Sequence, residues 1–432
     1  MQIVKNAFCS DKRSTTKKEA YAKIYPMSKI INFLKQETVL SVAGVLALLS
    51  IGLIKPDKQY LNYIDFRTLA ILLSLMAIMN GFQKIGVFDF AARVLIKRAG
   101  NVTALVLLLV LLCFFSSMLI TNDVALITFV PLTIITFEKM YPGSVVKPEE
   151  NLCPGSEKKQ SLFIISTVIL QTIAANLGSM LTPLGNPQNL YLYGISGMSF
   201  LQFLMIMLPY SVVSLVLILV SILFLKFYSK KLISEECISG IAGANESDVN
   251  FLWNRERKIL CTCYGALFAL SLLTVLHVIS FPILFVIVMV SLIVLDYLFG
   301  RNVVRTTDLS LIFTFIFLFV FIGNVGRVEV FKNFLEEFIS GREVISGVVA
   351  SQVMSNVPTA ILLSGFTEDV RGLIIGTNLG GLGTLIASMA SLISFKYIAR
   401  WNKKKRLQYF IGFTVMNLLY LGVLLIFNIY LV

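Results

Sequence analysis

The chain is poor in charge: only 14% of its 432 residues are Asp, Glu, Lys or Arg, while 57% are hydrophobic. A soluble domain carries roughly a quarter charged residues, so this composition excludes an ordinary soluble protein. Apolar runs long enough to cross a bilayer recur along the chain, and the polar stretches between them are too short for a separate globular core. We therefore expect one polytopic membrane domain without a soluble catalytic module.

Signatures of enzymes and of tightly bound cofactors are also scarce. The six cysteines are scattered and form no CxxC pair, so they predict neither a disulfide framework nor a metal site. The only histidine is His277, and the chain has neither an HExxH motif nor a Walker-type GxxxxGKS/T loop. We therefore expect no enzyme, no ATP-driven pump within this chain and no cofactor, with Na⁺ as the single bound ion to consider.

Positive charge is present, and its distribution is informative. The net charge is +13, and the basic residues sit at the ends of apolar spans. Cytoplasmic loops of membrane proteins carry such an excess, so the pattern indicates topology and not nucleic-acid binding. Residues 1–36 are polar and lysine-rich and lack an apolar signal segment, and we expect them to form a cytoplasmic N-terminal tail.

The apolar runs divide the chain into two similar halves. Each half contains one apolar stretch broken by polar residues, at 102–137 and at 343–366. The first stretch could form one very long helix, two spans, or a hairpin that enters and leaves on one side. Two hairpins together place every basic cluster, including residues 400–406, on the side of the N-terminus.

The resulting topology is all-α, with about nine full transmembrane helices and two re-entrant hairpins. One unpaired span, 258–277, turns the second half over, so the halves form inverted repeats around a midplane site. In this multi-pass protein of the plasma (inner) membrane, the C-terminus lies outside. The expected segments are the tail at 1–36, the first repeat at 37–228, a cytoplasmic linker with the connecting span at 229–278, and the second repeat at 279–432.

A short polar phrase occurs once in each half, inside apolar sequence. Each copy has Ser-x-x-x-Thr/Ser-Asn, followed later by Asn-Leu-Gly-x-x-x-Thr. The copies are Ser117 to Asn122 with Asn176 to Thr182, and Ser351 to Asn356 with Asn378 to Thr384. Because lipid tolerates interrupted helices only where protein encloses them, two matching interruptions point to a shared binding site.

Interrupted helices offer two kinds of ligand. Free N–H groups at helix N-termini bind anions without lysine or arginine, and exposed carbonyl and side-chain oxygens suit Na⁺. The residues expected to contact a small anionic substrate are Thr121, Asn122, Thr182, Asn186, Ser355, Asn356, Thr359 and Thr384. Those expected to form the cation or coupling sites are Asp123, Asn122, Asn176, Gly178, Asn356, Asn378 and Gly380.

Asp123 is the sharpest single residue in this set. A carboxylate near the bilayer centre is costly and is a functional candidate for that reason; it could bind Na⁺ or carry a proton. The alternative is a shallow Asp that caps the second helix of the hairpin. The matching position in the second half is Val357, so the two halves differ chemically there.

Four phrases carry a family resemblance: SMLITNDVALITFVPL (117–132), ANLGSMLTPLGNPQN (175–189), SQVMSNVPTAILL (351–363) and GTNLGGLGTLIAS (376–388). They resemble the ion transporter superfamily, which includes divalent anion/sodium symporters, citrate carriers, arsenite permeases and one type of sodium/proton antiporter. The resemblance implies an elevator mechanism, usually in a homodimer with fixed scaffold domains. The symporters have Ser-Asn-Thr at each hairpin tip; both tips here differ at the third position, and the Asn122-Asp123 pair is closer to arsenite permeases.

Together these features predict a secondary active transporter in the lipid bilayer that moves a small carboxylate or inorganic oxyanion with Na⁺ or H⁺. The rivals are a sodium/proton antiporter, an arsenite or oxyanion exporter, and a channel. An intramembrane protease is the last rival, because Gly194-Ile195-Ser196-Gly197 resembles a GxSG motif. A serine nucleophile needs a base, however, and His277 lies at the end of a different span.

Overall fold

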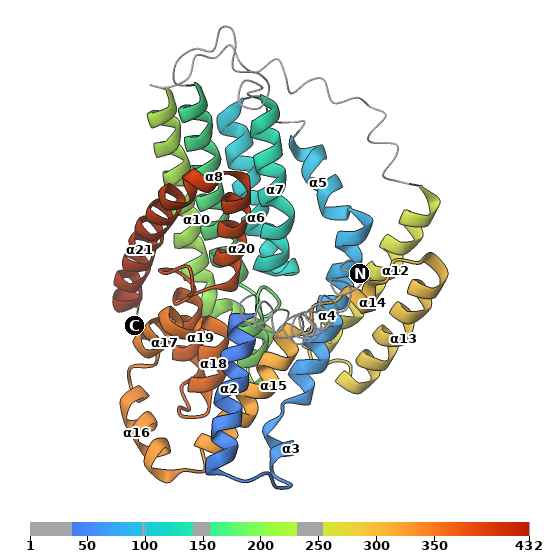
Figure 1. Ribbon diagram of the computed structural model, residues 1–432, viewed down its shortest axis with the longest axis vertical. Coiled ribbons are helices and arrows are strands. Elements are labelled where there is room, and N and C mark those ends of the chain that lie inside the picture. The colour runs from blue at the N-terminus through green and yellow to red at the C-terminus, as the bar shows by residue number, and fades with distance from the viewer. Residues whose placement is uncertain (1–36, 97–98, 100, 141–155, 231–253, 432) are drawn as a thin grey trace, which may run out of the picture.

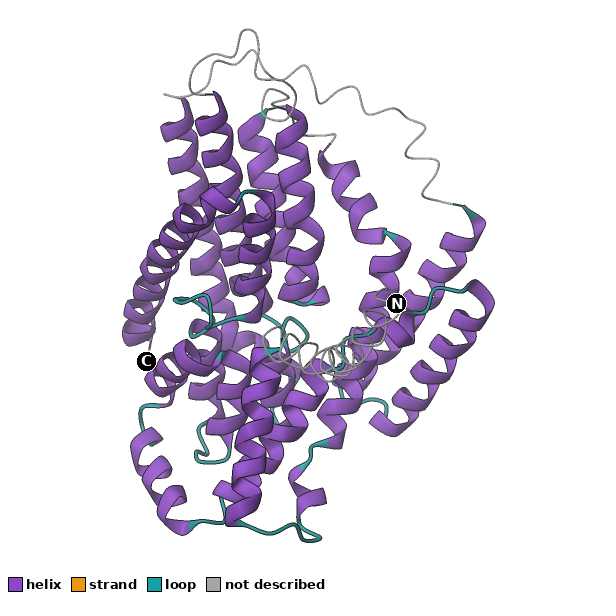
Figure 2. Cartoon of the chain, viewed as in Figure 1, coloured by secondary structure: helices purple, strands orange, loops and turns teal. Residues whose placement is uncertain are grey.

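The computed structural model describes residues 37–96, 99, 101–140, 156–230 and 254–431 (Figure 1). In these ranges every regular element is a helix, and the helices are joined by short loops (Figure 2). The expected N-terminal tail and the linker between 230 and 254 lie outside the described residues. The predicted all-helical architecture is confirmed for the part that the structure describes.

The helices follow one another with short connections through both halves. The first half contains α2 (Thr38–Leu53), α3 (Tyr60–Tyr63), α4 (Phe66–Ile85), α5 (Val87–Ile96), α6 (Val102–Ile120), α7 (Asn122–Met140), α8 (Ser156–Ser179), α9 (Pro187–Ser196) and α10 (Phe200–Lys230). The rest contains α12 (Arg255–Val275), α13 (Phe281–Phe299), α14 (Val303–Thr306), α15 (Ser310–Val325), α16 (Glu329–Ile339), α17 (Glu343–Met354), α18 (Asn356–Ser364), α19 (Val370–Leu379), α20 (Met389–Trp401), η3 (Lys403–Lys405) and α21 (Arg406–Leu431).

Seven of the described helices are long and apolar enough to cross a membrane. An eighth span results if α15 and α16, which are bent by 105° at their junction, are counted together. Helix α2 is also apolar but has only 16 residues. These lengths and compositions confirm a multi-pass membrane protein, because each span must satisfy its own backbone hydrogen bonds in hydrocarbon.

Polar residues at the ends of the apolar runs define where several helices begin. Asp65 accepts a hydrogen bond from the N–H of Thr68 (3.0 Å) at the start of α4. Asn101 accepts one from Ala104 (2.7 Å) at the start of α6. An acceptor at this position satisfies one of the N–H groups that have no partner in the first turn, which is why Asp and Asn precede helices.

Both broken apolar stretches fold into pairs of helices. Thr121 separates α6 from α7 and Ser355 separates α17 from α18, with backbone angles (φ 69°, ψ 150°) and (φ 75°, ψ 154°) that interrupt the helical path in the same way. In each pair the two helices contact each other, and α6 and α7 lie side by side in Figure 1. One very long helix over 102–137 is therefore excluded, and two packed helices that meet at Thr121 take its place.

The other interruption in each half is an unwound segment. The chain leaves helical geometry between α8 and α9 and again between α19 and α20. In the first segment, Pro183 and Pro187 cannot donate backbone hydrogen bonds, and in the second Gly383 adopts φ +105°, which L side chains rarely adopt. The two packed helix pairs and the two unwound segments meet near mid-height in Figure 1.

The helices form two groups that are named here by their members. The α4 group consists of α2, α4, α12, α13 and α15, and the hairpin group consists of α6 to α10 and α17 to α21; most close helix–helix contacts join members of one group. In Figure 1, α12 and α13 lie on the right and α8, α10 and α21 on the left.

Polar side chains connect the helices within the α4 group. Lys84 of α4 donates to the carbonyl of Arg301 (2.6 Å), and Asn324 of α15 donates to Tyr60 (2.8 Å). Arg327 and Asp57 form an ion pair of 2.8 Å at one end of the group. The hydrogen bond from Arg327 holds the pKa of the Asp57 carboxyl below its ordinary value. The group is thus held by several contacts between segments far apart in sequence.

The contact between the groups is largely apolar where α9 meets α15. Tyr191 of α9 packs its ring against Phe315 and Phe319 of α15, with centroids 6.3 and 5.6 Å apart. A side chain at Gly365 in the hairpin group would meet Ile322 of α15 at 3.0 Å. Apolar contacts of this kind have no fixed directional requirement, unlike hydrogen bonds.

Gly178 gives a direct test of how α6 packs on α8. A Cβ at this position would lie 2.0 Å from the backbone oxygen of Phe114, and backbone cannot move aside as a flexible side chain can. We expect Gly178→Ala to abolish or severely reduce the yield of folded protein, measured by size-exclusion chromatography of the detergent-solubilised protein. The control is Gly52→Ala in α2, where a Cβ meets nothing within 4 Å. Equal yields from both variants would contradict this packing.

Candidate functional site

The first helix pair places its tip against the unwound segment of its own half. The N–H of Asn122 donates to the carbonyl of Gly185 (3.1 Å), and its side-chain Nδ2 donates to Oδ1 of Asn176 (3.1 Å). Thr121, at the tip, has the positive φ that exposes this N–H to the neighbouring segment. The tip is therefore held by hydrogen bonds from a backbone amide and a side-chain amide.

The second tip repeats this arrangement. The N–H of Asn356 donates to the carbonyl of Ala387 (3.0 Å), in the unwound segment that follows α19. Ser355 occupies the position of Thr121 and is buried, with 1% of its surface exposed. Both asparagines that follow the tips are also buried. The two polar phrases thus produce the same local structure in both halves.

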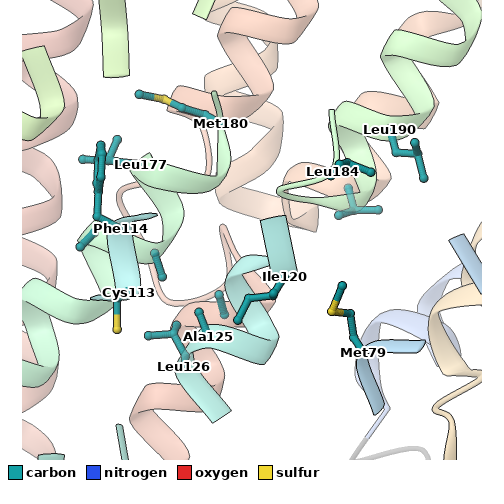
Figure 3. Close-up of a cluster of buried hydrophobic side chains, with 14 of the residues drawn as sticks. Met79, Cys113, Phe114, Ile120, Ala125, Leu126, Leu177, Met180, Leu184 and Leu190 are labelled. Carbon is teal, nitrogen blue, oxygen red and sulfur yellow. The ribbon is translucent and has the colours of Figure 1, made fainter. Parts of the chain in front are cut away.

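The spacing of serine and glycine in each phrase has a packing reason. A Cβ at Gly178 would lie 2.7 Å from Oγ of Ser117, and a Cβ at Gly380 would lie 2.6 Å from Oγ of Ser351. A small residue on the first helix of each pair therefore faces a glycine at the end of the broken span. Figure 3 shows the buried apolar side chains around the first of these contacts, with Phe114 and Leu177 lying together.

The two halves are joined by reciprocal hydrogen bonds between amides and hydroxyls. In the first set, Asn176 accepts from Ser388 (3.0 Å) and donates to Ser391 (3.3 Å). Each set crosses from the end of one broken span to the start of the helix beyond the other.

In the second set, Asn378 accepts from Asn186 (3.3 Å) and donates to Asn189 (2.6 Å). Asn186 and Asn189 follow Asn176 at the same spacings at which the two serines of the first set follow Asn378. The predicted coupling residues Asn176 and Asn378 are therefore brought together with Asn122 and Asn186 in one buried polar network, in which 6% or less of each of these side chains is exposed.

A cavity of about 420 Å³ lies beside the first tip. Thr121, Asp123 and Asn186 line it from the hairpin group, and α4 and the residues before α15 supply the opposite wall. Among the described residues no cluster of three or more His, Cys, Asp or Glu side chains could hold a metal ion. A Na⁺ at this site would therefore depend on hydroxyl, amide and carbonyl oxygens together with single carboxylates.

The Asp123 carboxylate lines this cavity. Its Oδ1 is buried and has no hydrogen-bond partner. The N–H of Asp123 donates to Oδ1 of Asn122 (2.9 Å), so the asparagine, and not the aspartate, provides the side-chain acceptor at the start of α7. The helix-cap alternative for Asp123 is therefore not what the geometry shows, and the carboxylate remains available to a ligand.

Three predicted substrate residues occupy other surroundings. Thr182 donates to the carbonyl of Met118 and accepts from the N–H of Gly185 (3.1 Å), so it ties the unwound segment to α6. Thr359 donates within its own helix to Ser355 (2.8 Å). Thr384 is exposed and donates to the carbonyl of Gln352 (3.3 Å). Their hydroxyls therefore stabilise the local backbone in this conformation.

The sequence analysis missed two glutamines. Nε2 of Gln352 donates to the carbonyls of Gly380 and Leu382 (2.9 Å each), and its Oε1 accepts from the N–H of Thr384 (2.8 Å), so it replaces the lost helical partners of the second unwound segment. Gln188 has 1% of its surface exposed, and neither of its amide atoms has a partner. A polar residue within an otherwise apolar phrase was the signal that both offered.

Comparison with known families agrees with this geometry. A model described as "Citrate transporter" matches residues 28–369, which is most of the chain. The chain belongs to the citrate transporter family. As a member of this family it is a membrane transporter, and the multi-pass architecture described above is the one such a role requires. The superfamily suggested by the four polar phrases is thereby confirmed.

Relatives of this citrate transporter family member are also transporters or membrane proteins. It is 30% identical over 357 residues to an uncharacterized transporter of Methanocaldococcus jannaschii, covering 82% of the chain and 86% of the relative. It is 28% identical over 343 residues to the inner membrane protein YbiR of Escherichia coli, covering 78% and 82%. It is 23% identical over 192 residues to the transporter arsB of Dictyostelium discoideum, covering 44% and 30%.

Asn378 tests the network between the halves. Asn378→Ala removes the donor to Asn189 and the acceptor for Asn186, and each buried polar atom left unpaired costs about 1–3 kcal/mol. We expect the midpoint of thermal unfolding in detergent to fall by several degrees. Asn333→Ala, at an exposed position of α16, serves as the control and should leave the midpoint unchanged. An unchanged midpoint for both variants would show that the network does not stabilise the fold.

Proposed function

We propose that the protein is a secondary active transporter that carries a small anion, a carboxylate or an inorganic oxyanion, together with Na⁺ or H⁺. The observation that carries this proposal is the meeting of two helix-pair tips and two unwound segments in one buried, uncharged polar network. Membrane proteins maintain such interruptions where they bind cargo, because unwound backbone supplies ligands that a regular helix cannot.

The chemistry of the network favours an anion. The helices α7, α18, α9 and α20 begin at or beside it, and the N-terminus of a helix carries a partial positive charge with free N–H groups. Asn122 and Asn356, the first residues of α7 and α18, add amide donors, so an anion can be held without a fixed positive charge. Substrate residues in this proposal are Thr121, Asn122, Thr182, Asn186, Ser355, Asn356, Thr359 and Thr384.

Two further features support inverted repeats. A second cavity of about 400 Å³ is lined by Asp65, Phe319 and Ile361, at the places in the repeat where Asp308, Met76 and Ile127 line the first cavity. Helices that correspond in the two halves therefore present the same positions to two different cavities. Such a pair of cavities is what alternating access from two membrane sides requires.

The division into two helix groups supports an elevator mechanism. The hairpin group carries both tips and both unwound segments, and the α4 group has its own polar connections. An apolar contact such as that of Tyr191 with Phe319 can slide without breaking directional bonds. In this proposal the hairpin group moves, the α4 group stays fixed, and two copies associate as a homodimer with the N-terminus cytoplasmic and the C-terminus outside.

Cation coupling follows from the charge at the first tip. An ionised Asp123 would repel an anion bound beside it, so a cation or proton that neutralises the carboxylate should accompany transport. The proposed coupling residues are Asp123, Asn122, Asn176, Gly178, Asn356, Asn378 and Gly380. Two of them, Gly178 and Gly380, contribute by letting the broken spans approach the helix pairs.

The tip asparagines test the anion site. Citrate, succinate, sulfate, phosphate and arsenite are first screened for an increase in thermal stability, with and without Na⁺. In proteoliposomes, counterflow of the anion that stabilises most should then fall about tenfold or more in Asn122→Ala and in Asn356→Ala, a loss of ~1.4 kcal/mol or more. Asn333→Ala should transport normally. Full counterflow by both tip variants would remove the site assignment, and a simple channel would show no counterflow at all.

A sodium/proton antiporter is the second candidate, and the buried Asp123 carboxylate favours it. Proteoliposomes that contain a pH-sensitive dye separate the two functions. The anion transporter should move no protons in response to a Na⁺ gradient when the stabilising anion is absent. Na⁺-driven proton movement without any anion, lost in Asp123→Asn, would establish the antiporter instead. The similarity to the transporter arsB makes arsenite the most informative oxyanion in the screen, as cargo of an exporter.

A further inference from the structure

The cavity beside the first tip contains carboxylates from both helix groups. Asp123 comes from α7 of the hairpin group, and Asp308 lies just before α15 of the α4 group. The other charged residues that line the cavity are Glu37, before α2, and Lys396 of α20. Three acidic groups and one ammonium group therefore face the same enclosed volume.

Neither aspartate is neutralised by a close basic partner. Oδ1 of Asp123 is buried and has no hydrogen-bond partner, and Asp308 accepts only the N–H of Ser310 (2.8 Å). In the part of the chain that the structure describes, ion pairs within 4 Å join Arg301 to Glu256, Arg327 to Asp57 and Lys332 to Glu336. Lys396 therefore shares the cavity without making an ion pair to either aspartate.

Two carboxylates in one enclosed space are most stable when one cation lies between them. Each carboxylate alone is costly to bury, and their charges repel each other when both are ionised. The hydroxyls of Thr121, Thr306 and Thr307 line the same cavity and supply further oxygens of the kind that a hard cation prefers. The cavity thus has the composition of a site for Na⁺ or for a proton shared by two carboxylates.

We propose that Asp123 and Asp308 together bind one monovalent cation, and that this site exists only while α7 stands beside the start of α15. The inference rests on the proposed function, because it requires the hairpin group to move against the α4 group. Movement separates the two carboxylates and dismantles the site, so bound cation favours the conformation described here. Asp308 is then a coupling residue of the fixed group, and Asp123 is its partner in the moving group.

The opposite side of the molecule lacks this pair. Asp65 corresponds to Asp308 and lines the second cavity, but the position that corresponds to Asp123 is Val357. Asp65 instead accepts from the N–H of Thr68 as a helix cap. One cavity can therefore hold the cation between two carboxylates and the other cannot, which gives the transport cycle a difference between its two end states.

Thermal unfolding of the purified full-length protein tests the pair. NaCl is titrated against choline chloride at constant ionic strength, at one acidic and one alkaline pH. We expect Na⁺ to raise the unfolding midpoint, and more so at alkaline pH because protons compete. Asp123→Asn should abolish the response, and Asp308→Asn should raise the half-saturating Na⁺ concentration about tenfold or more. The double variant should behave like Asp123→Asn, because residues of one site are not additive.

Matched variants and outcomes complete the test. Asp65→Asn retains a capping side chain and should respond as the wild type does, while Asp308→Glu keeps the charge and should respond even if Asp308→Asn folds poorly. A midpoint that depends on pH but not on Na⁺, through both aspartates, identifies a proton as the cation and supports the pair. The proposal is overturned by a normal response in Asp308→Asn, by additive effects, or by no response to either cation. If the Asn122→Ala variant still loses its anion response in that case, the proposed function stands and only the pair is wrong.

Discussion

The structure depends on how four interrupted helices satisfy their backbone in an apolar environment. Each interruption removes hydrogen bonds that a bilayer cannot replace. The protein replaces them with amide side chains: Asn176 and Asn378 each bond to the other half, and Gln352 bonds to the carbonyls of its neighbouring segment. These contacts hold the tips and the unwound segments in place, and they account for the asparagines in otherwise apolar phrases.

This solution leaves the centre polar but without formal charge. The N–H groups of the tips donate to carbonyls of the unwound segments, so the backbone itself forms the framework of the site. Charge is confined to the cavity at one side, where Asp123 and Asp308 belong to different helix groups. A neutral binding region beside an acidic cavity allows an anion and a cation to bind near each other without either one being held by a fixed opposite charge.

Close packing explains why the arrangement is rigid within each group. Gly178 and Gly380 bring the ends of the broken spans against Ser117 and Ser351, at distances that no other residue type allows. Between the groups, aromatic rings such as that of Tyr191 meet apolar surface. Rigid groups with an apolar contact between them can change their relative position while the tips and unwound segments of one group stay together.

The sequence by itself determined the helices, the positions of their interruptions and the pairing of the two polar phrases. These features are local: hydropathy reports which runs can lie in lipid, and proline, glycine, Asp and Asn mark where helical hydrogen bonding stops. The superfamily resemblance was available for the same reason, since the phrases that carry it are continuous in the chain.

Only the tertiary structure decided which of these polar residues meet. Thr182 and Thr384 hold the same place in their phrases, yet one is buried against α6 and the other is exposed beside Gln352. The reciprocal bonds between halves, the burial of Gln188 and the place of Asp308 in the cavity likewise depend on segments that are far apart in the chain. The physical reason is that a bilayer makes helix formation a local requirement, whereas the partners of a buried polar group are chosen by packing.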